Sequence, residues 1–109
     1  MNVCLAALVA IICFGGVARA EAPQVLLQQY KCYMCHADLE TKTGPAYIDV
    51  AARYRGNPKA VVIVAAMVKK GVRGNSPWHM PPHPEVSDAD ARTMARYILS
   101  LEKKGSRAD

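Results

Sequence analysis

At residues 30–36 the chain reads Tyr30-Lys31-Cys32-Tyr33-Met34-Cys35-His36, and this segment decides how the rest of the sequence is interpreted. Cys32 and Cys35 share one side of a helical turn, and His36 follows directly. Two such thiols can each add to one vinyl group of a single porphyrin, while the adjacent imidazole binds its iron. The segment therefore predicts one haem c, attached through Cys32 and Cys35, with His36 as an axial ligand.

Three other kinds of site use cysteines at this spacing. A thioredoxin-like redox pair needs a βαβ context, and no parallel-strand pattern is visible in the sequence. A zinc site needs further ligands at matching spacing, and no second Cys-x-x-Cys pair is present. A plain disulfide between Cys32 and Cys35 leaves His36 without a role. Haem attachment is the interpretation that uses all three side chains.

A second ligand is expected in the proline-rich stretch Trp78-His79-Met80-Pro81-Pro82-His83-Pro84. A methionine thioether suits a haem iron whose reduction potential is raised. Most methionines instead fill gaps in a core, and Met67 and Met94 fit this role because they lie at helical spacing among apolar residues. Met80 differs, because prolines with fixed φ hold its loop. We therefore expect Met80, rather than either neighbouring histidine, to be the sixth ligand.

The chain resembles the class I c-type cytochromes, specifically the small bacterial monohaem electron carriers. The resemblance covers nearly all of residues 22–103 and rests on Cys-x-x-Cys-His, on Thr43-Gly44-Pro45-Ala46-Tyr47, on Met80-Pro81-Pro82 and on an amphipathic last helix. It implies that the Pro45 carbonyl fixes the imidazole of His36. It also gives Trp78 the role of a propionate partner, although Trp78 and His79 here directly precede the methionine.

Apolar periodicity predicts an all-α fold, with about four helices wrapped around one flat cofactor, as in class I cytochromes c. The helices are expected at residues 22–36, 46–54 and 59–70, with a last one that begins after Ser87. Asn57 and Pro58 are expected to cap and to begin the third helix. Asp90 follows Ser87 by three positions, as in a capping box. The last helix is expected to bury Ala91, Met94, Ala95, Ile98 and Leu101.

The N-terminal segment has the pattern of a secretory leader. Residues 3–17 are almost unbroken by polar side chains, but roughly 15 residues are fewer than a membrane span needs. Ala18-Arg19-Ala20 places small residues at both positions that a signal peptidase reads. We expect residues 1–20 to be a signal peptide and residues 21–109 to be a periplasmic cytochrome c domain. A retained membrane anchor is the alternative.

A haem with both axial positions filled has no open position for a substrate, which predicts a one-electron carrier rather than an enzyme. The first alternative is a haem c electron-transfer subunit of a larger periplasmic oxidoreductase complex. The second is a haem sensor in which Met80 dissociates. The sequence points to no nucleic-acid partner, to no membrane association after signal cleavage, and to a monomer.

The expected partners are redox proteins, such as an oxidase, a nitrite reductase or a dehydrogenase. Residues 21–109 keep all but one of the 14 basic side chains and all nine acidic ones, which leaves a net charge of about +4. Lys31, Lys69, Lys70 and Arg73 lie near the two ligand segments and favour a partner with an acidic docking face. The alternative is that these charges only solvate helix ends.

Overall fold

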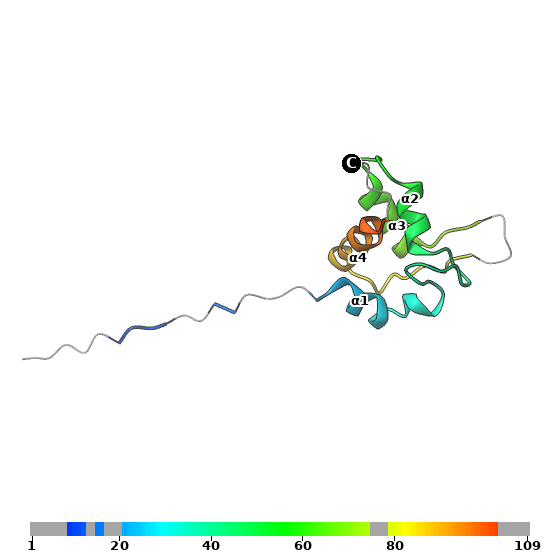
Figure 1. Ribbon diagram of the computed structural model, residues 1–109. Coiled ribbons are helices and arrows are strands. Elements are labelled where there is room, and N and C mark those ends of the chain that lie inside the picture. Colours follow the sequence, from blue (N-terminus) through cyan, green and yellow to red (C-terminus); the bar gives the residue numbers. More distant parts are fainter. Residues whose placement is uncertain (1–8, 13–14, 17–20, 75–78, 103–109) are drawn as a thin grey trace, which may run out of the picture.

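The computed structural model of the chain describes residues 9–12, 15–16, 21–74 and 79–102. In this part of the chain the elements are α1 (Pro23–Gln29), a 3₁₀ turn η1 (Cys32–Met34), α2 (Tyr47–Arg53), α3 (Ala60–Lys70) and α4 (Asp88–Ser100) (Figure 1). The expected all-α fold with four helices is confirmed. None of the helices among the described residues has the length and apolar character that a membrane span requires.

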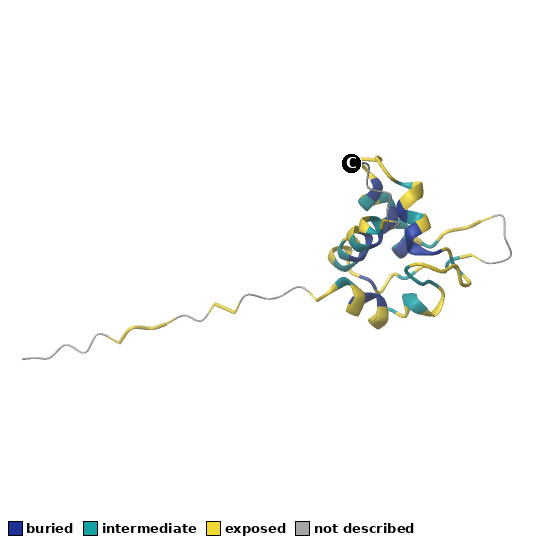
Figure 2. Cartoon of the chain, in the orientation of Figure 1, coloured by how far each residue is buried: buried dark blue, intermediate teal, exposed yellow. Residues whose placement is uncertain are grey.

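Helix α4 is the centre of the packing, because it contacts α1, α2 and α3. Figure 2 shows the buried positions gathered where α2, α3 and α4 meet. Burial of this apolar surface stabilises the fold. The buried cluster consists of Leu26, Leu27, Tyr47, Val64, Ala65, Val68, Val86, Ala91, Met94, Ala95 and Ile98.

The start of α4 agrees with the sequence, whereas the start of α3 differs. The Ser87 hydroxyl accepts a hydrogen bond from the Asp90 amide at 3.1 Å and caps α4. The side chain of Asn57 instead accepts from the Lys59 amide at 2.9 Å, and Lys59 is the residue that precedes α3. Asn57 and Pro58 therefore form a turn ahead of the helix, and the expectation that Asn57 caps α3 and Pro58 begins it was wrong.

The helix expected over residues 22–36 is wrong in its second half. It ends at Gln29, and the chain passes through Lys31, which has left-handed backbone angles of φ 61° and ψ 25°. A residue in this conformation cannot continue a right-handed helix. Cys32 therefore begins η1 and Cys35 ends it, in a separate turn that contacts α1.

Candidate functional site

The turn η1 presents two unpaired thiols. The amides of Cys35 and His36 both donate to the carbonyl oxygen of Cys32, at 3.1 and 3.0 Å. These bonds close a tight turn with Cys32 half-buried and Cys35 exposed, and neither cysteine is in a disulfide. Burial raises the pKa of the Cys32 thiol, which is therefore protonated at neutral pH.

The imidazole of His36 is fixed by three neighbours. Its Nδ1 lies 2.7 Å from the carbonyl oxygen of Pro45, and its ring stacks on that of Tyr47 with a centroid distance of 4.9 Å. Gly44 lies so close that a Cβ at this position would be 2.4 Å from Cε1 of the imidazole. A carbonyl oxygen only accepts hydrogen bonds, so Nδ1 carries the proton and Nε2 keeps its lone pair for a metal ion.

The hydrogen bond between His36 and Pro45 is the one that the resemblance implies. The residues at this site fit a haem, because free thiols precede an imidazole whose Nε2 is available to coordinate iron. The roles of these side chains toward haem stay predictions.

The segment after the motif connects His36 to α2. Ala46 offers no side-chain cap to α2, and backbone carbonyls replace one. The amide of Tyr47 donates to the Ala37 carbonyl at 3.0 Å, and that of Ile48 donates to the Asp38 carbonyl at 2.9 Å. These bonds satisfy amides that a helix start leaves without partners. They also fix the Tyr47 ring relative to His36.

The carboxylate of Asp38 links the motif to α4, and sequence reasoning missed it. The Tyr33 hydroxyl donates to one oxygen at 2.9 Å, and the Tyr97 hydroxyl donates to the other. Burial raises the pKa of Tyr33, with Asp38 adding to the effect. The hydrogen bond to Asp38 is the main cause of the raised pKa of Tyr97. No pattern in the sequence pairs residues 59 positions apart.

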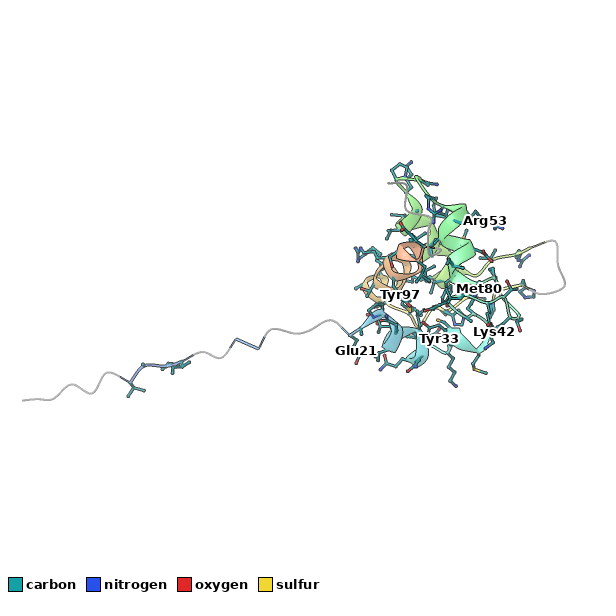
Figure 3. The ribbon with its side chains drawn as sticks, in the orientation of Figure 1. Glu21, Tyr33, Lys42, Arg53, Met80 and Tyr97 are labelled. Carbon is teal, nitrogen blue, oxygen red and sulfur yellow. The ribbon has the colours of Figure 1, made fainter. Side chains whose placement is uncertain are left out.

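Met80 is held from a different part of the chain. Its amide and carbonyl pair with those of Val72, at N···O distances of 3.1 and 3.0 Å. Gly71 has a φ of +76°, and a Cβ there would lie 2.6 Å from the Met80 carbonyl oxygen. The half-buried side chain of Met80 packs against the core. In the view of Figure 3 it lies above Tyr33 and Lys42, in the body of the fold.

The histidines on either side of Met80 are placed differently. His79 is exposed. His83 is half-buried, its amide donates to the carbonyls of Val68 and Lys69 at the end of α3, and its Nδ1 lies 3.2 Å from a Glu85 carboxylate oxygen. Trp78, the expected propionate partner, lies outside the described residues.

A model of the family described as cytochrome c matches residues 20–102. The chain belongs to the cytochrome c family. The relatives of this cytochrome c include cytochrome c-552 of Hydrogenobacter thermophilus, 39% identical over 97 residues, or 87% of this chain and 95% of that one. Cytochrome c-551 of Pseudomonas aeruginosa is 45% identical over 85 residues, covering 76% of this chain and 80% of that protein.

The solved structures agree with these relatives. The crystal structure of wild-type Nitrosomonas europaea cytochrome c552 matches with a TM-score of 0.69 and 36% identity, covering 72% of this chain and 99% of that one. The resemblance to small class I c-type cytochromes and the expected fold are both confirmed. Family membership also places the protein among the electron-transfer cytochromes, which carry covalently bound haem.

Proposed function

We propose that the protein is a periplasmic one-electron carrier with a single haem c. Cys32 and Cys35 form the thioether bonds, and His36 and Met80 are the axial ligands. The observation that carries the proposal is the hydrogen bond from His36 Nδ1 to Pro45, which leaves Nε2 free on the residue that follows the free thiols of Cys32 and Cys35. When bound, the haem supplies an iron that alternates between Fe(II) and Fe(III).

The chain's own groups keep the iron's surroundings constant between these two states. The Pro45 carbonyl and the Tyr47 ring fix the direction and plane of the imidazole. The backbone pair between Val72 and Met80 brings the thioether-bearing residue to a fixed place in the fold. Two protein ligands leave no position for a substrate, which supports electron transfer as the function and argues against catalysis.

We also propose that residues 1–20 are a cleaved signal peptide and that residues 21–109 form the periplasmic cytochrome. The family match from residue 20 and the start of α1 at Pro23 support this boundary. Mass spectrometry of the purified protein should give a chain that begins at Glu21 and carries one haem. An intact N-terminus on a membrane-bound protein would contradict the proposal.

The proposed partners are redox proteins with an acidic docking face, which a monomeric carrier meets transiently. Lys70 and Arg73 are exposed and supply positive charge beside the Met80 segment. Lys69 contributes less, because its ammonium pairs with Asp88 and lowers the pKa of that carboxyl. Gel filtration of a periplasmic extract, followed by haem absorbance, should place the haem at the size of the free chain. Elution with a larger complex would favour the oxidoreductase subunit.

A ligand experiment tests the axial assignment. Met80→Ala should abolish the weak red-edge absorption of methionine-ligated Fe(III) and lower the reduction potential. His79→Ala and His83→Ala are the matched controls, and both should keep the band. Loss of the band in a histidine variant, with no change in Met80→Ala, would overturn the assignment. Spectroelectrochemical titration of the wild type should give one reversible one-electron wave.

A further inference from the structure

Asp38 is an acidic residue that lies two positions after His36 and is partly shielded from water. Its side chain is half-buried, and the Tyr33 hydroxyl donates to one carboxylate oxygen at 2.9 Å. The Tyr97 hydroxyl donates to the other oxygen, and the two tyrosines lie next to each other in Figure 3. This is the hydrogen-bond pattern of an ionised carboxylate, which only accepts hydrogen bonds.

No cation among the described residues forms an ion pair with Asp38. The ion pairs in this part of the chain join Lys69 to Asp88 and His83 to Glu85. Hydrogen bonds from neutral hydroxyl groups stabilise a carboxylate without removing its net charge. The negative charge of Asp38 therefore acts on the groups that lie beside it.

The charge of Asp38 acts on the side of the site where His36 lies. The Asp38 carbonyl oxygen accepts a hydrogen bond from the Ile48 amide at 2.9 Å, which fixes Asp38 to the start of α2. On this first turn of α2, the Tyr47 ring stacks on the imidazole of His36. Burial raises the pKa of Tyr47, and the charge of Asp38 adds to this effect. The electric field of Asp38 therefore reaches the ring against which His36 packs.

The two tyrosines keep this charge in place. Tyr33 belongs to η1 and Tyr97 to α4, so their hydrogen bonds hold the carboxylate between two parts of the fold. The carboxylate cannot turn outward into water without breaking both bonds. An exposed charge is screened by the ions of the solution, whereas a partly buried charge is screened much less.

We infer that Asp38 lowers the reduction potential of the proposed haem, because its carboxylate favours the oxidised state of an iron bound to His36. The inference rests on the proposed electron-transfer function and adds a residue that governs its energetics. Oxidised iron carries one positive charge more than reduced iron, so a fixed negative charge nearby favours loss of the electron.

The test compares the reduction potentials of holoprotein variants by spectroelectrochemical titration. Asp38→Asn removes the charge with little change of shape. The triple variant Tyr33→Phe/Asp38→Leu/Tyr97→Phe removes the charge together with both hydroxyls, so that no hydroxyl is left without its partner. Glu40→Gln is the matched control, because it removes an equal charge from an exposed residue of the same segment.

Both Asp38 variants should shift the electron-exchange equilibrium toward the reduced protein by roughly tenfold, which for one electron raises the potential by about 59 mV. Glu40→Gln should shift this equilibrium by less than about twofold. Its shift should vanish near 1 M salt, where the Debye length is about 3 Å, while that of the Asp38 variants should largely persist. An unchanged potential in either Asp38 variant, or an equal shift in Glu40→Gln, would overturn the inference.

Urea unfolding of the oxidised and the reduced holoprotein separates the effect of the charge from a structural role. Lost hydrogen bonds weaken both redox states equally, whereas a lost negative charge weakens the oxidised state more. Asp38→Asn should therefore lower the folding equilibrium constant of the oxidised protein by roughly tenfold more than that of the reduced protein. Equal losses in the two states would overturn the inference. A wild-type protein without a reversible one-electron wave would instead overturn the proposed function, and the inference with it.

Discussion

His36 is fixed through its side chain, whereas Met80 is fixed through its backbone. The imidazole of His36 is hydrogen-bonded to Pro45 and stacked on Tyr47. The hydrogen bonds at Met80 join its amide and carbonyl to Val72, and its thioether makes only packing contacts. Of the two proposed ligands, His36 therefore has its orientation set before a cofactor binds, and Met80 has only its position set.

The His36 side and the Met80 side of the site also differ in how far apart in the sequence their contacting residues lie. The residues that bond to His36, stack on it or approach it closely in the described structure lie within residues 32–47, so local structure assembles them. Met80 depends on pairing across a loop and on the end of α3, where the amide of His83 is bound. Damage to the His36 side should therefore disturb haem binding and the fold together. Damage to the Met80 side should exchange one ligand and leave the rest intact.

The largest effect is expected from Gly44→Ala. The added Cβ would lie 2.4 Å from the imidazole, so the ring must leave the Pro45 carbonyl or the loop must shift. Overpacking of this severity costs about 3 kcal/mol of the free energy of unfolding. Haem content per chain should fall, measured by the pyridine haemochrome, together with the urea midpoint.

The control for this variant is Gly56→Ala. Gly56 has a φ of +80° but nothing within 4 Å of the added Cβ, so it isolates backbone strain. Gly56→Ala should lower the free energy of unfolding by about 1 kcal/mol and leave the haem content unchanged. If Gly44→Ala were no worse than this control, the fixed orientation of His36 would not matter.

A smaller effect is expected from Gly71→Ala. The Cβ would meet the Met80 carbonyl at 2.6 Å and the Pro82 nitrogen at 2.9 Å, at a positive φ. We expect the free energy of unfolding to fall by about 2 kcal/mol and the Met80 backbone to be displaced. The covalent haem and its His36 ligand should remain, while the red-edge band weakens and the reduced protein binds carbon monoxide. An intact band would show that the backbone pair does not position the methionine.

The smallest effect concerns the link from the motif to α4. The raised pKa values of Tyr33 and Tyr97 stabilise the fold below pH 10, where the tyrosines of the unfolded chain begin to ionise. That stability is lost as the pH rises through the folded values, so the urea midpoint should fall above pH 10. Tyr97→Phe should lower the free energy of unfolding by about 1 kcal/mol at neutral pH. Its urea midpoint should then fall less steeply above pH 10 than that of the wild type.

The matched control is Tyr54→Phe, because the Tyr54 hydroxyl contacts the sulfur of Met67 rather than a carboxylate. It removes a tyrosine hydroxyl without touching Asp38, so at neutral pH it should lower the free energy of unfolding by less than Tyr97→Phe does. If the urea midpoint of Tyr97→Phe fell as steeply above pH 10 as that of the wild type, the hydrogen bond to Asp38 would not be the cause of this pH dependence.

Sequence reasoning was most successful where the determinants are local. The Ser87 cap depends on residues three positions apart, and the contact between His36 and Pro45, nine positions apart, is the one that the family resemblance implies; both are present. The left-handed break at Lys31 was missed, because lysine rarely adopts this conformation and gives no signal of it. The link between Asp38 and Tyr97 was missed because it forms only once α4 has packed.

The most direct test of the account is mass spectrometry of the tryptic peptide from Cys32 to Lys42 of the purified holoprotein. This peptide contains both cysteines and His36. We predict that it carries the added mass of one haem, that neither thiol reacts with an alkylating reagent, and that acidified acetone extracts no haem. A peptide of unmodified mass with two alkylated thiols would contradict the central claim, because the turn η1 would then hold no covalent haem.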